Sequence, residues 1–332
     1  LMYDVKKYLV LATAVFFIKQ PLFGPKKIIL LLLVISAFTA LHGLFIIGNF
    51  LITHKRQVTW NEIYYGNISI VCIVLLTVVK NRKYKLFLSV AALIAIIALL
   101  ATETRSIWIS TTLCIMAYLL FIFWSKLKKL QVRQLVMTII MVCFLLMAID
   151  LFMRLFLGTD LPSFLFNRMT EFNNNELINP FSSLGYRLYE SFVVWTQRSF
   201  WGHGTGAYLY LVQTQFPEKK FMYWPSIHSE YFEMLHKWGF FGLGLYLLFI
   251  GAFLKQSLQL FLSGKKFISS IGAIAFLTIC NTLVTSITSS YITRVNMIIW
   301  DILMIGVVVN YRKRMPKRKL FRSALFPGQR RP

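Results

Sequence analysis

The sequence of 332 residues contains none of the short motifs by which nucleotide and metal sites are usually recognised. There is no H-E-x-x-H pair of zinc ligands, no P-loop, no glycine-rich dinucleotide turn and no carboxylate cluster with calcium spacing. The few cysteines each lie inside an apolar run, without C-x-x-C or Cys/His spacing; they are Cys72, Cys114, Cys143 and Cys280. We therefore expect no metal, no cofactor and cysteines that are buried as small hydrophobic residues.

Acidic residues are also scarce, since 12 Asp and Glu stand against 36 Lys and Arg and give a formal net charge of +24. In a soluble protein this balance would suggest nucleic-acid binding. The basic tail after Tyr311 lacks the interleaved aromatic residues or folded module that would support binding of RNA or DNA. We interpret the tail as an electrostatic anchor to anionic lipid headgroups, and we expect no nucleic-acid partner.

Long apolar runs are what the chain has in abundance. Hydrophobic residues make up 57% of the sequence, and about twenty helical residues are enough to cross the hydrocarbon core of a bilayer. We predict an all-α polytopic integral membrane protein with about nine transmembrane helices and one large extracytoplasmic, partly helical loop. The predicted spans lie near residues 8–24, 28–52, 63–79, 86–102, 106–123, 134–157, 232–254, 267–289 and 294–310.

Basic residues alternate along the predicted connections. One set of connections holds 23 of the 36 Lys and Arg and no acid; it comprises residues 19–27, 80–85, 126–133, 255–266 and the tail. By the positive-inside rule this set is cytoplasmic, and the long loop faces out. We therefore expect N-terminal transmembrane helices over 1–157, a large periplasmic loop over 158–227, C-terminal transmembrane helices over 228–311 and a basic cytoplasmic tail over 312–332.

The first residues, L-M-Y-D-V-K-K, lack the basic, apolar and small-residue regions of a signal peptide. Nine spans and a cytoplasmic C-terminus would put Lys6 and Lys7 on the outer side, where basic residues are disfavoured. Further helices before the first residue would remove this conflict. We expect that N-terminal spans are missing from the chain.

Two arginines at the predicted outer surface are candidates for binding phosphate. Arg187 lies in the loop motif G-Y-R-L-Y-E, and a guanidinium can hold two phosphate oxygens through its planar fork. Arg105 lies beside Glu103 in A-T-E-T-R-S-I-W, a polar step between two apolar runs. The alternatives are a surface salt bridge of Arg187, for example with Glu190, and an Arg105 side chain that reaches to lipid phosphate.

His228 is the candidate for proton transfer, because it opens the apolar run of a helix at the membrane boundary and imidazole titrates near neutral pH. Glu230 or Glu233 could supply a neighbouring negative charge. The alternative is a histidine that only caps a helix. We interpret His236 as an interhelical hydrogen-bonding group and His203 as a loop residue between glycines.

Acidic residues within or near the spans offer a further alternative. Asp150 and Arg154 have the i,i+4 spacing of a local ion pair, and Asp301 lies deep in the last span. A non-catalytic transporter could use these residues for coupling. It would require inverted repeats and paired broken spans, which the sequence does not display.

Three stretches then occur in one order along the chain. The first, A-T-E-T-R-S-I-W-I-S, has a Thr-x-x-Arg-x-x-Trp step; the second, G-Y-R-L-Y-E-S-F-V-V-W-T-Q-R-S-F-W-G-H-G-T-G-A-Y, runs from an Arg to a Trp and into a Gly-x-Gly turn. The third, H-S-E-Y-F-E-M-L-H-K-W-G-F-F-G-L-G-L-Y, starts a helix with a His. Together they resemble the superfamily of O-antigen ligases and O-antigen polymerases. Family members commonly have about twelve helices, and W-G-H-G departs from their more apolar approach to the Gly turn.

The resemblance implies transfer of a glycan from an undecaprenyl-diphosphate carrier to a sugar hydroxyl at the periplasmic face of the bacterial inner membrane. It assigns His228 as the base, and Arg105 and Arg187 as the cations that stabilise the departing diphosphate without a metal. Candidate substrate-binding residues are Glu230, Trp195, Gly204 and Tyr186. Trp195, like Trp201, Tyr208 and Trp224, could instead lie at the level of the lipid headgroups.

Within the superfamily, a ligase attaches the glycan to lipid A-core, whereas a polymerase joins two carrier-linked repeat units. The Arg, Arg, His pattern looks more like the ligase branch. We therefore expect a membrane glycosyltransferase of O-antigen ligase type that acts in lipopolysaccharide biosynthesis and inverts the anomeric centre. Its expected partners are the carrier-linked donor, a lipid A-core acceptor and the lipid bilayer.

Overall fold

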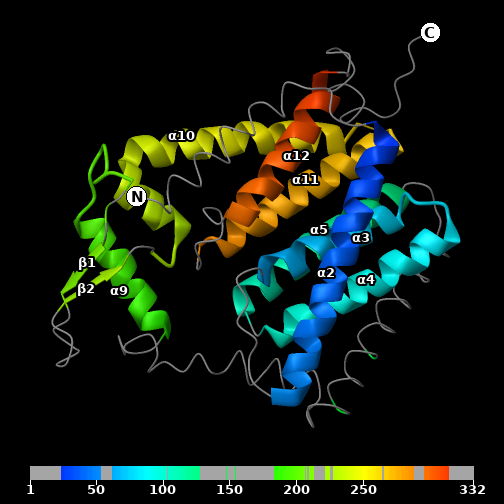
Figure 1. Cartoon of the computed structure of the whole chain (residues 1–332). Coiled ribbons are helices and arrows are strands. Elements are labelled where there is room, and N and C mark those ends of the chain that lie inside the picture. Colours follow the sequence, from blue (N-terminus) through cyan, green and yellow to red (C-terminus); the bar gives the residue numbers. More distant parts are fainter. Residues whose placement is uncertain are drawn as a thin grey trace.

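The computed structural model describes residues 24–53, 62–102, 104–127, 183–205, 207, 209–212, 221–224, 227–263, 265–287 and 295–313, together with positions 147 and 154. Seven of the nine predicted spans fall largely on these residues, and each of the seven is an α-helix (Figure 1). They are α2 (Pro25–Thr53), α3 (Glu62–Leu76), α4 (Arg82–Ala101), α5 (Arg105–Leu127), α10 (Glu230–Phe261), α11 (Lys266–Thr285) and α12 (Val295–Lys313). The predicted spans near residues 8–24 and 134–157 lie outside the described residues.

Four of the described helices, α2, α4, α10 and α11, are long and apolar enough to cross a membrane. The apolar helix Glu62–Leu76 and the apolar part of α5, Ser106–Ile122, are shorter. Large apolar side chains point outward from these helices, among them Phe38 on α2 and Leu248 on α10, which suits a surface covered by lipid. The length and composition of these helices support a multi-pass membrane protein, whereas the count of nine spans and their topology stay predictions.

A buried polar cluster joins α3, α5 and α11. The side-chain oxygen of Asn281 on α11 accepts hydrogen bonds from Ser110 and Thr111 on α5, at 2.6 and 3.2 Å, and its amide nitrogen donates to Asn67 on α3 at 2.9 Å. Gly66 leaves the space for this approach, since a Cβ there would lie 2.3 Å from the hydroxyl of Thr111. Small and polar residues of this kind hold helices together where lipid removes the hydrophobic drive.

This polar cluster also fixes which helix ends lie together. Asn67 and Ser110 lie near the beginnings of α3 and α5, and Asn281 lies near the end of α11. The hydroxyl of Thr104, just before α5, donates to the carboxylate of Glu62 at the start of α3. The starts of α3 and α5 and the end of α11 therefore occupy one end of the bundle, which we call the site end.

The described part of the long loop contains a helix and a small sheet. The helix α9 (Ser183–Thr196) confirms the predicted partly helical character. The strands β1 (Leu209–Val212) and β2 (Phe221–Trp224) pair in antiparallel fashion, with Leu209 opposite Trp224. The sheet is an addition to the predicted all-α fold. Figure 1 shows α9 and the two strands standing to one side of the bundle.

A second, smaller core attaches the loop to the membrane helices. Val194 of α9, Leu209 of β1, Ile227 and Leu235 of α10 are all buried and in contact. The start of α10 is in turn fixed to α11, because the N–H of Glu230 donates to the carbonyl of Ser286 at 3.1 Å. The loop therefore packs at the site end of the bundle.

A sharp bend divides α10 at Gly239, where φ is 67° and ψ is −169°; it is visible in Figure 1 on the side where α9 lies. In an unbroken helix, the N–H groups of Phe240 and Phe241 would donate to the carbonyls of His236 and Lys237. Instead, these two carbonyls accept from the N–H groups of His203 and Gly204, both at 2.9 Å. The bend therefore relies on the loop for these partners.

The exchange is reciprocal, since the N–H groups of Phe240 and Phe241 donate to the carbonyls of Ser199 and Phe200, at 3.3 and 3.1 Å. Residues 199–204 thus fill the break in α10 with four backbone hydrogen bonds, an arrangement we call the loop–helix junction. Two glycines permit this approach: a Cβ on Gly202 would lie 2.4 Å from the carbonyl oxygen of Lys237, and one on Gly239 would lie 2.2 Å from that of Phe200.

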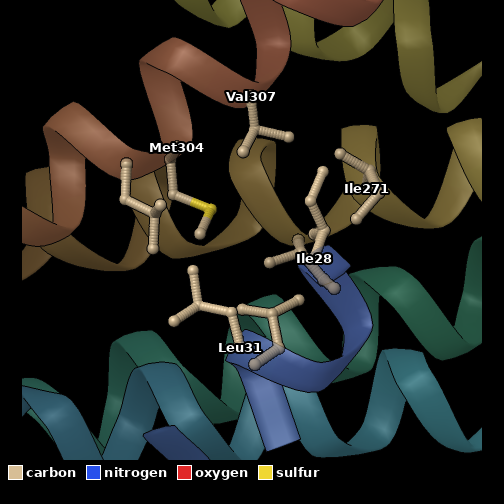
Figure 2. A pocket seen from close by; sticks show the side chains of 8 residues that line it. Ile28, Leu31, Ile271, Met304 and Val307 are labelled. Atoms are coloured by element: carbon tan, nitrogen blue, oxygen red, sulfur yellow. The ribbon is translucent and has the colours of Figure 1, made fainter. Parts of the chain in front are cut away.

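A small apolar pocket lies among α2, α11 and α12 (Figure 2). Its lining side chains are all aliphatic or methionine; they are Ile28, Leu31, Leu32, Ile271, Ile274, Leu303, Met304 and Val307. Because Ile28 and Ile271 lie near the beginnings of α2 and α11, the pocket is at the end of α11 away from the site end. It has no group that could take part in chemistry.

Candidate functional site

His228 and Glu190 form a polar pair where the loop meets the site end of the bundle. One carboxylate oxygen of Glu190, Oε2, lies 3.0 Å from Nδ1 of the His228 ring and also accepts the backbone N–H of His228 at 2.9 Å. The Glu190 side chain is only 1% exposed, whereas the His228 side chain is 40% exposed. The pair therefore combines an enclosed carboxylate with an imidazole that is open to its surroundings on one side.

The position of His228 follows from the local sequence. It lies directly before Ser229, whose extended backbone precedes the first turn of α10, as the sequence predicted. The buried Ile227 on its other side fixes the segment to the small core. Glu190 reaches it from the last turns of α9, 38 residues earlier in the chain. Two elements of different parts of the chain thus meet at the imidazole.

The contact determines which ring nitrogen is suited to chemistry. A carboxylate beside Nδ1 favours the tautomer with its proton on Nδ1, and this leaves Nε2 as the basic nitrogen. The carboxylate also stabilises the positive charge that the ring acquires when Nε2 takes a proton. Chemically, an imidazole in this arrangement can accept a proton at Nε2 while the buried carboxylate holds the ring.

Glu190 is the residue that the sequence prediction missed as a partner of His228. The prediction considered Glu190 only as a salt-bridge partner of Arg187, and it considered Glu230 and Glu233 as the charges beside His228. The structure gives Glu233 a different partner, Lys237, whose Nζ lies 2.7 Å from its carboxylate one turn along α10. Both side chains of this ion pair are buried.

Arg187 lies one turn before Glu190 in α9. Residues three apart in a helix share a face, so the face of α9 that meets His228 also carries position 187. The structure describes the side chains of α9 from Glu190 onward, and those of Arg187 and Tyr186 lie outside the described part. Their contacts with phosphate or sugar stay predictions.

Arg105 is the first residue of α5 and therefore lies at the site end. Its neighbour Thr104 donates to Glu62 of α3, and the indole Nε1 of Trp108 donates to the carbonyl of Leu99 at 2.8 Å. These bonds fix the turn between α4 and α5 on both sides of Arg105. The backbone thus brings Arg105 to the same end of the bundle as His228, while its side chain lies outside the described part.

Two further predicted substrate-binding residues, Glu230 and Gly204, lie in or beside the first turns of α10. Glu230 is fully buried at the first turn of α10. Gly204, with φ of 97°, donates to the carbonyl of Lys237 and so belongs to the loop–helix junction. Backbone geometry explains Gly204 without a substrate, and contact of either residue with sugar stays a prediction.

Trp195 belongs to an exposed aromatic cluster around the bend of α10. Its ring stands edge-on to Phe240, with centroids 6.1 Å apart, and the guanidinium of Arg198 lies 4.6 Å above it. Trp201 packs against Phe241 with centroids 5.2 Å apart. At about 100° per residue, Trp195 lies ~140° around α9 from Glu190. This placement favours an interfacial role for Trp195 over direct contact with a sugar at His228.

The structure describes some of the remaining polar and cysteine residues singled out in the sequence. His203 is exposed and bonds the carbonyl of Gln197 through Nε2, and its ring lies 4.8 Å from that of the buried His236. Asp301 lies in α12, and its Oδ1 has no hydrogen-bond partner among the described residues. Asp150 and the large segment after it, up to α9, lie outside the described part apart from position 154. Cys72 and Cys114 are buried, as predicted, and Cys280 is half-buried.

Comparison with known families finds one similarity that includes these features. A family model described as O-antigen ligase (Wzy_C) matches residues 90–247. Over these residues, which are just under half of the sequence, the chain is similar to the O-antigen ligase family. Searches of curated proteins and of solved structures found no match.

The O-antigen ligase match covers every element of the site. It begins within α4, includes Arg105, α9 and the loop–helix junction, and ends within α10, beyond His228. Proteins of this family are glycosyltransferases of ligase or polymerase type, and their substrates are lipid-linked glycans in a membrane. The match supports the predicted enzyme class, a glycosyltransferase of ligase or polymerase type.

Proposed function

We propose that the protein transfers an O-antigen or related polysaccharide from undecaprenyl diphosphate to a sugar hydroxyl of lipid A-core at the periplasmic face of the inner membrane. The observation that carries this proposal is the contact between His228 and Glu190, which lies inside the family match. An imidazole that is half open and backed by a buried carboxylate is suited to take a proton from an acceptor hydroxyl.

In the proposed reaction, the acceptor oxygen attacks the anomeric carbon of the carrier-linked sugar. The bond from acceptor oxygen to carbon forms while the bond from carbon to the diphosphate oxygen breaks. The hydroxyl proton passes to Nε2 of His228, and undecaprenyl diphosphate leaves with the electron pair. A single displacement of this kind inverts the anomeric centre.

The leaving group becomes more negative as the bond breaks, and fixed cations stabilise that charge. We assign this role to Arg105 and Arg187, whose backbone positions lie at the start of α5 and on the face of α9 that meets His228. With two guanidinium groups on the diphosphate, the proposed reaction is independent of metal.

The test of this proposal uses the purified protein in nanodiscs with a carrier-linked glycan, lipid A-core and an excess of chelator. We expect glycosylated lipid A-core and released undecaprenyl diphosphate in equal amounts. Absence of any covalent product with a family-appropriate donor and acceptor, with or without added divalent cations, would overturn the proposal.

A polymerase uses the same leaving group, so one further arm of the assay separates the two activities. The carrier-linked glycan is supplied without lipid A-core. A ligase leaves the donor unchanged under these conditions, whereas a polymerase converts it into longer carrier-linked chains. The appearance of such chains would replace the proposed acceptor with a second carrier-linked unit.

Replacing Arg187 or Arg105 with Lys tests the proposed grip on the diphosphate. Lysine keeps the positive charge but loses the planar fork, so we expect kcat/KM for the donor to fall by about 10- to 100-fold. Arg82→Lys serves as the matched control, because Arg82 is exposed at the start of α4, away from the site end. Wild-type kcat/KM in both site variants would remove the arginines from the mechanism.

A further inference from the structure

The carboxylate of Glu190 lies in a position where burial is unfavourable for a charged group. Its side chain is almost fully buried, and an enclosed carboxylate costs free energy unless hydrogen-bond donors compensate for the lost water. Both hydrogen bonds that the structure shows for Glu190 come from His228, one from the main chain and one from the ring. Its second oxygen, Oε1, has no hydrogen-bond partner within the described part of the chain.

The two hydrogen bonds act on one residue in two ways. The bond to the backbone N–H fixes the main chain of position 228, and the bond to Nδ1 fixes the rotation of the ring about that main chain. Because both bonds end on the same oxygen, the ring cannot turn away without losing its alignment with the carboxylate. A histidine that merely capped a helix would not require a partner of this kind.

We propose that Glu190 is the positioning residue of this enzyme: it holds the imidazole of His228 in the Nδ1–H tautomer and thereby directs Nε2 toward the acceptor hydroxyl. This inference rests on the proposed function of His228. It adds a residue on α9 whose role is to act through His228 rather than on the substrate.

Glu190 and His228 are contributed by different segments of the chain. Because Glu190 belongs to α9 and His228 to the start of α10, the base is correctly oriented only when the loop is docked. The small core of Val194, Leu209, Ile227 and Leu235 provides that docking within a few residues of the pair. Disturbing the seat of α9 should therefore impair the base even when His228 itself is unchanged.

The test replaces the carboxylate by its neutral isostere, Glu190→Gln. The amide keeps the shape of the side chain and an oxygen that can still accept from the backbone N–H and the Nδ1–H of His228, but it loses the negative charge beside the ring. We expect kcat to fall by about 10- to 1,000-fold, with the KM of donor and acceptor within about threefold of wild type. Glu190→Asp retains the charge and should restore part of kcat.

A spectroscopic measurement separates positioning from a purely structural role. Nitrogen-15 NMR of histidine-labelled protein in nanodiscs, assigned by difference with His228→Gln, reports which ring nitrogen carries the proton. We expect the neutral His228 ring to be protonated on Nδ1 in the wild type and mainly on Nε2 in Glu190→Leu, which leaves no acceptor from position 190 beside Nδ1. Glu233→Gln is the matched control: it also neutralises a buried carboxylate near the site, but its partner is Lys237, so the Nδ1–H signal should persist.

The outcomes distinguish this inference from the proposed function. If His228→Ala is inactive while Glu190→Gln keeps wild-type kcat and Glu190→Leu keeps the Nδ1–H signal, Glu190 is not the positioning residue and the role of His228 stands. If His228→Ala is fully active, the assignment of the base fails. The NMR comparison tests the tautomer even before an acceptor is known, and an Nε2–H ring in the wild type would overturn the inference.

Discussion

Replacing His228 with Ala is expected to lower kcat for glycan transfer by about 100- to 10,000-fold, the usual contribution of a positioned general base. The acceptor hydroxyl is a poor nucleophile while it keeps its proton, and the structure provides His228 with a buried carboxylate suited to holding it in place. The measurement is the initial rate of product formation at saturating donor and acceptor. Binding of the donor should be retained, because the proposed phosphate contacts come from other residues.

The control for His228→Ala is a second histidine of the same region. His203 is exposed, and its ring hydrogen bond goes to the carbonyl of Gln197. His203→Ala removes an imidazole near the site without touching the pair, so its kcat should remain within about threefold of wild type. Full activity of His228→Ala, or equal loss in both variants, would show that His228 does not act as the base.

Gly202→Ala is expected to prevent stable folding of the loop on α10. A Cβ at this position would lie 2.4 Å from the carbonyl oxygen of Lys237 and 2.5 Å from the nitrogen of Gly239. Both are backbone atoms, so no side chain can rotate to make room. The positive φ of 77° adds strain for any residue with a side chain. We expect a loss of more than about 4 kcal/mol in stability, seen as aggregation or a greatly lowered Tm in detergent.

The matched control is Gly244→Ala in the membrane part of α10. A Cβ at Gly244 would meet nothing within 4 Å, and alanine favours helix more than glycine by about 1 kcal/mol. Its Tm should therefore equal or exceed that of the wild type. If Gly202→Ala also retained the wild-type Tm, the close backbone approach at the loop–helix junction would be wrong.

Hydropathy predicted the membrane helices well, because a long apolar run has few alternatives in a bilayer. The run near 28–52 corresponds to α2 (Pro25–Thr53), and that near 86–102 corresponds to α4 (Arg82–Ala101). The prediction was weaker for α10, where the helix extends well beyond 232–254 and bends at Gly239. The bend depends on carbonyls and N–H groups of residues 199–204, which a local hydropathy pattern cannot contain.

The pairing of His228 with Glu190 was not predicted from the sequence, and the roles of the predicted site residues stay predictions. The motifs selected His228, Arg187 and Arg105 from short local patterns. Charge neighbours were then sought nearby in sequence, and this led to Glu230 and Glu233 rather than to Glu190, which lies 38 residues from His228. A single sequence offers no measure of such distant contacts. The helical spacing of Arg187 and Glu190 was the available signal, since it placed both on one face of α9.

The sheet was missed for a related reason. β1 and β2 have only four residues each, and such short strands are weak signals beside spans of about twenty residues. Their pairing, Leu209 with Trp224, depends on the course of the chain between them. Leu209 of this pair contributes to the small core that seats the loop.

The loop–helix junction has a consequence for the order in which the protein is made. Residues 199–204 precede α10 in the chain, so they have been synthesised, and on the predicted topology exported, before α10 emerges from the ribosome. When α10 enters the bilayer, the N–H groups of His203 and Gly204, which donate to the carbonyls of His236 and Lys237, are therefore already on the outer side. The bend can then form while α10 inserts. Ile227 and His228 immediately precede α10, so they lie beside the loop from the start of insertion.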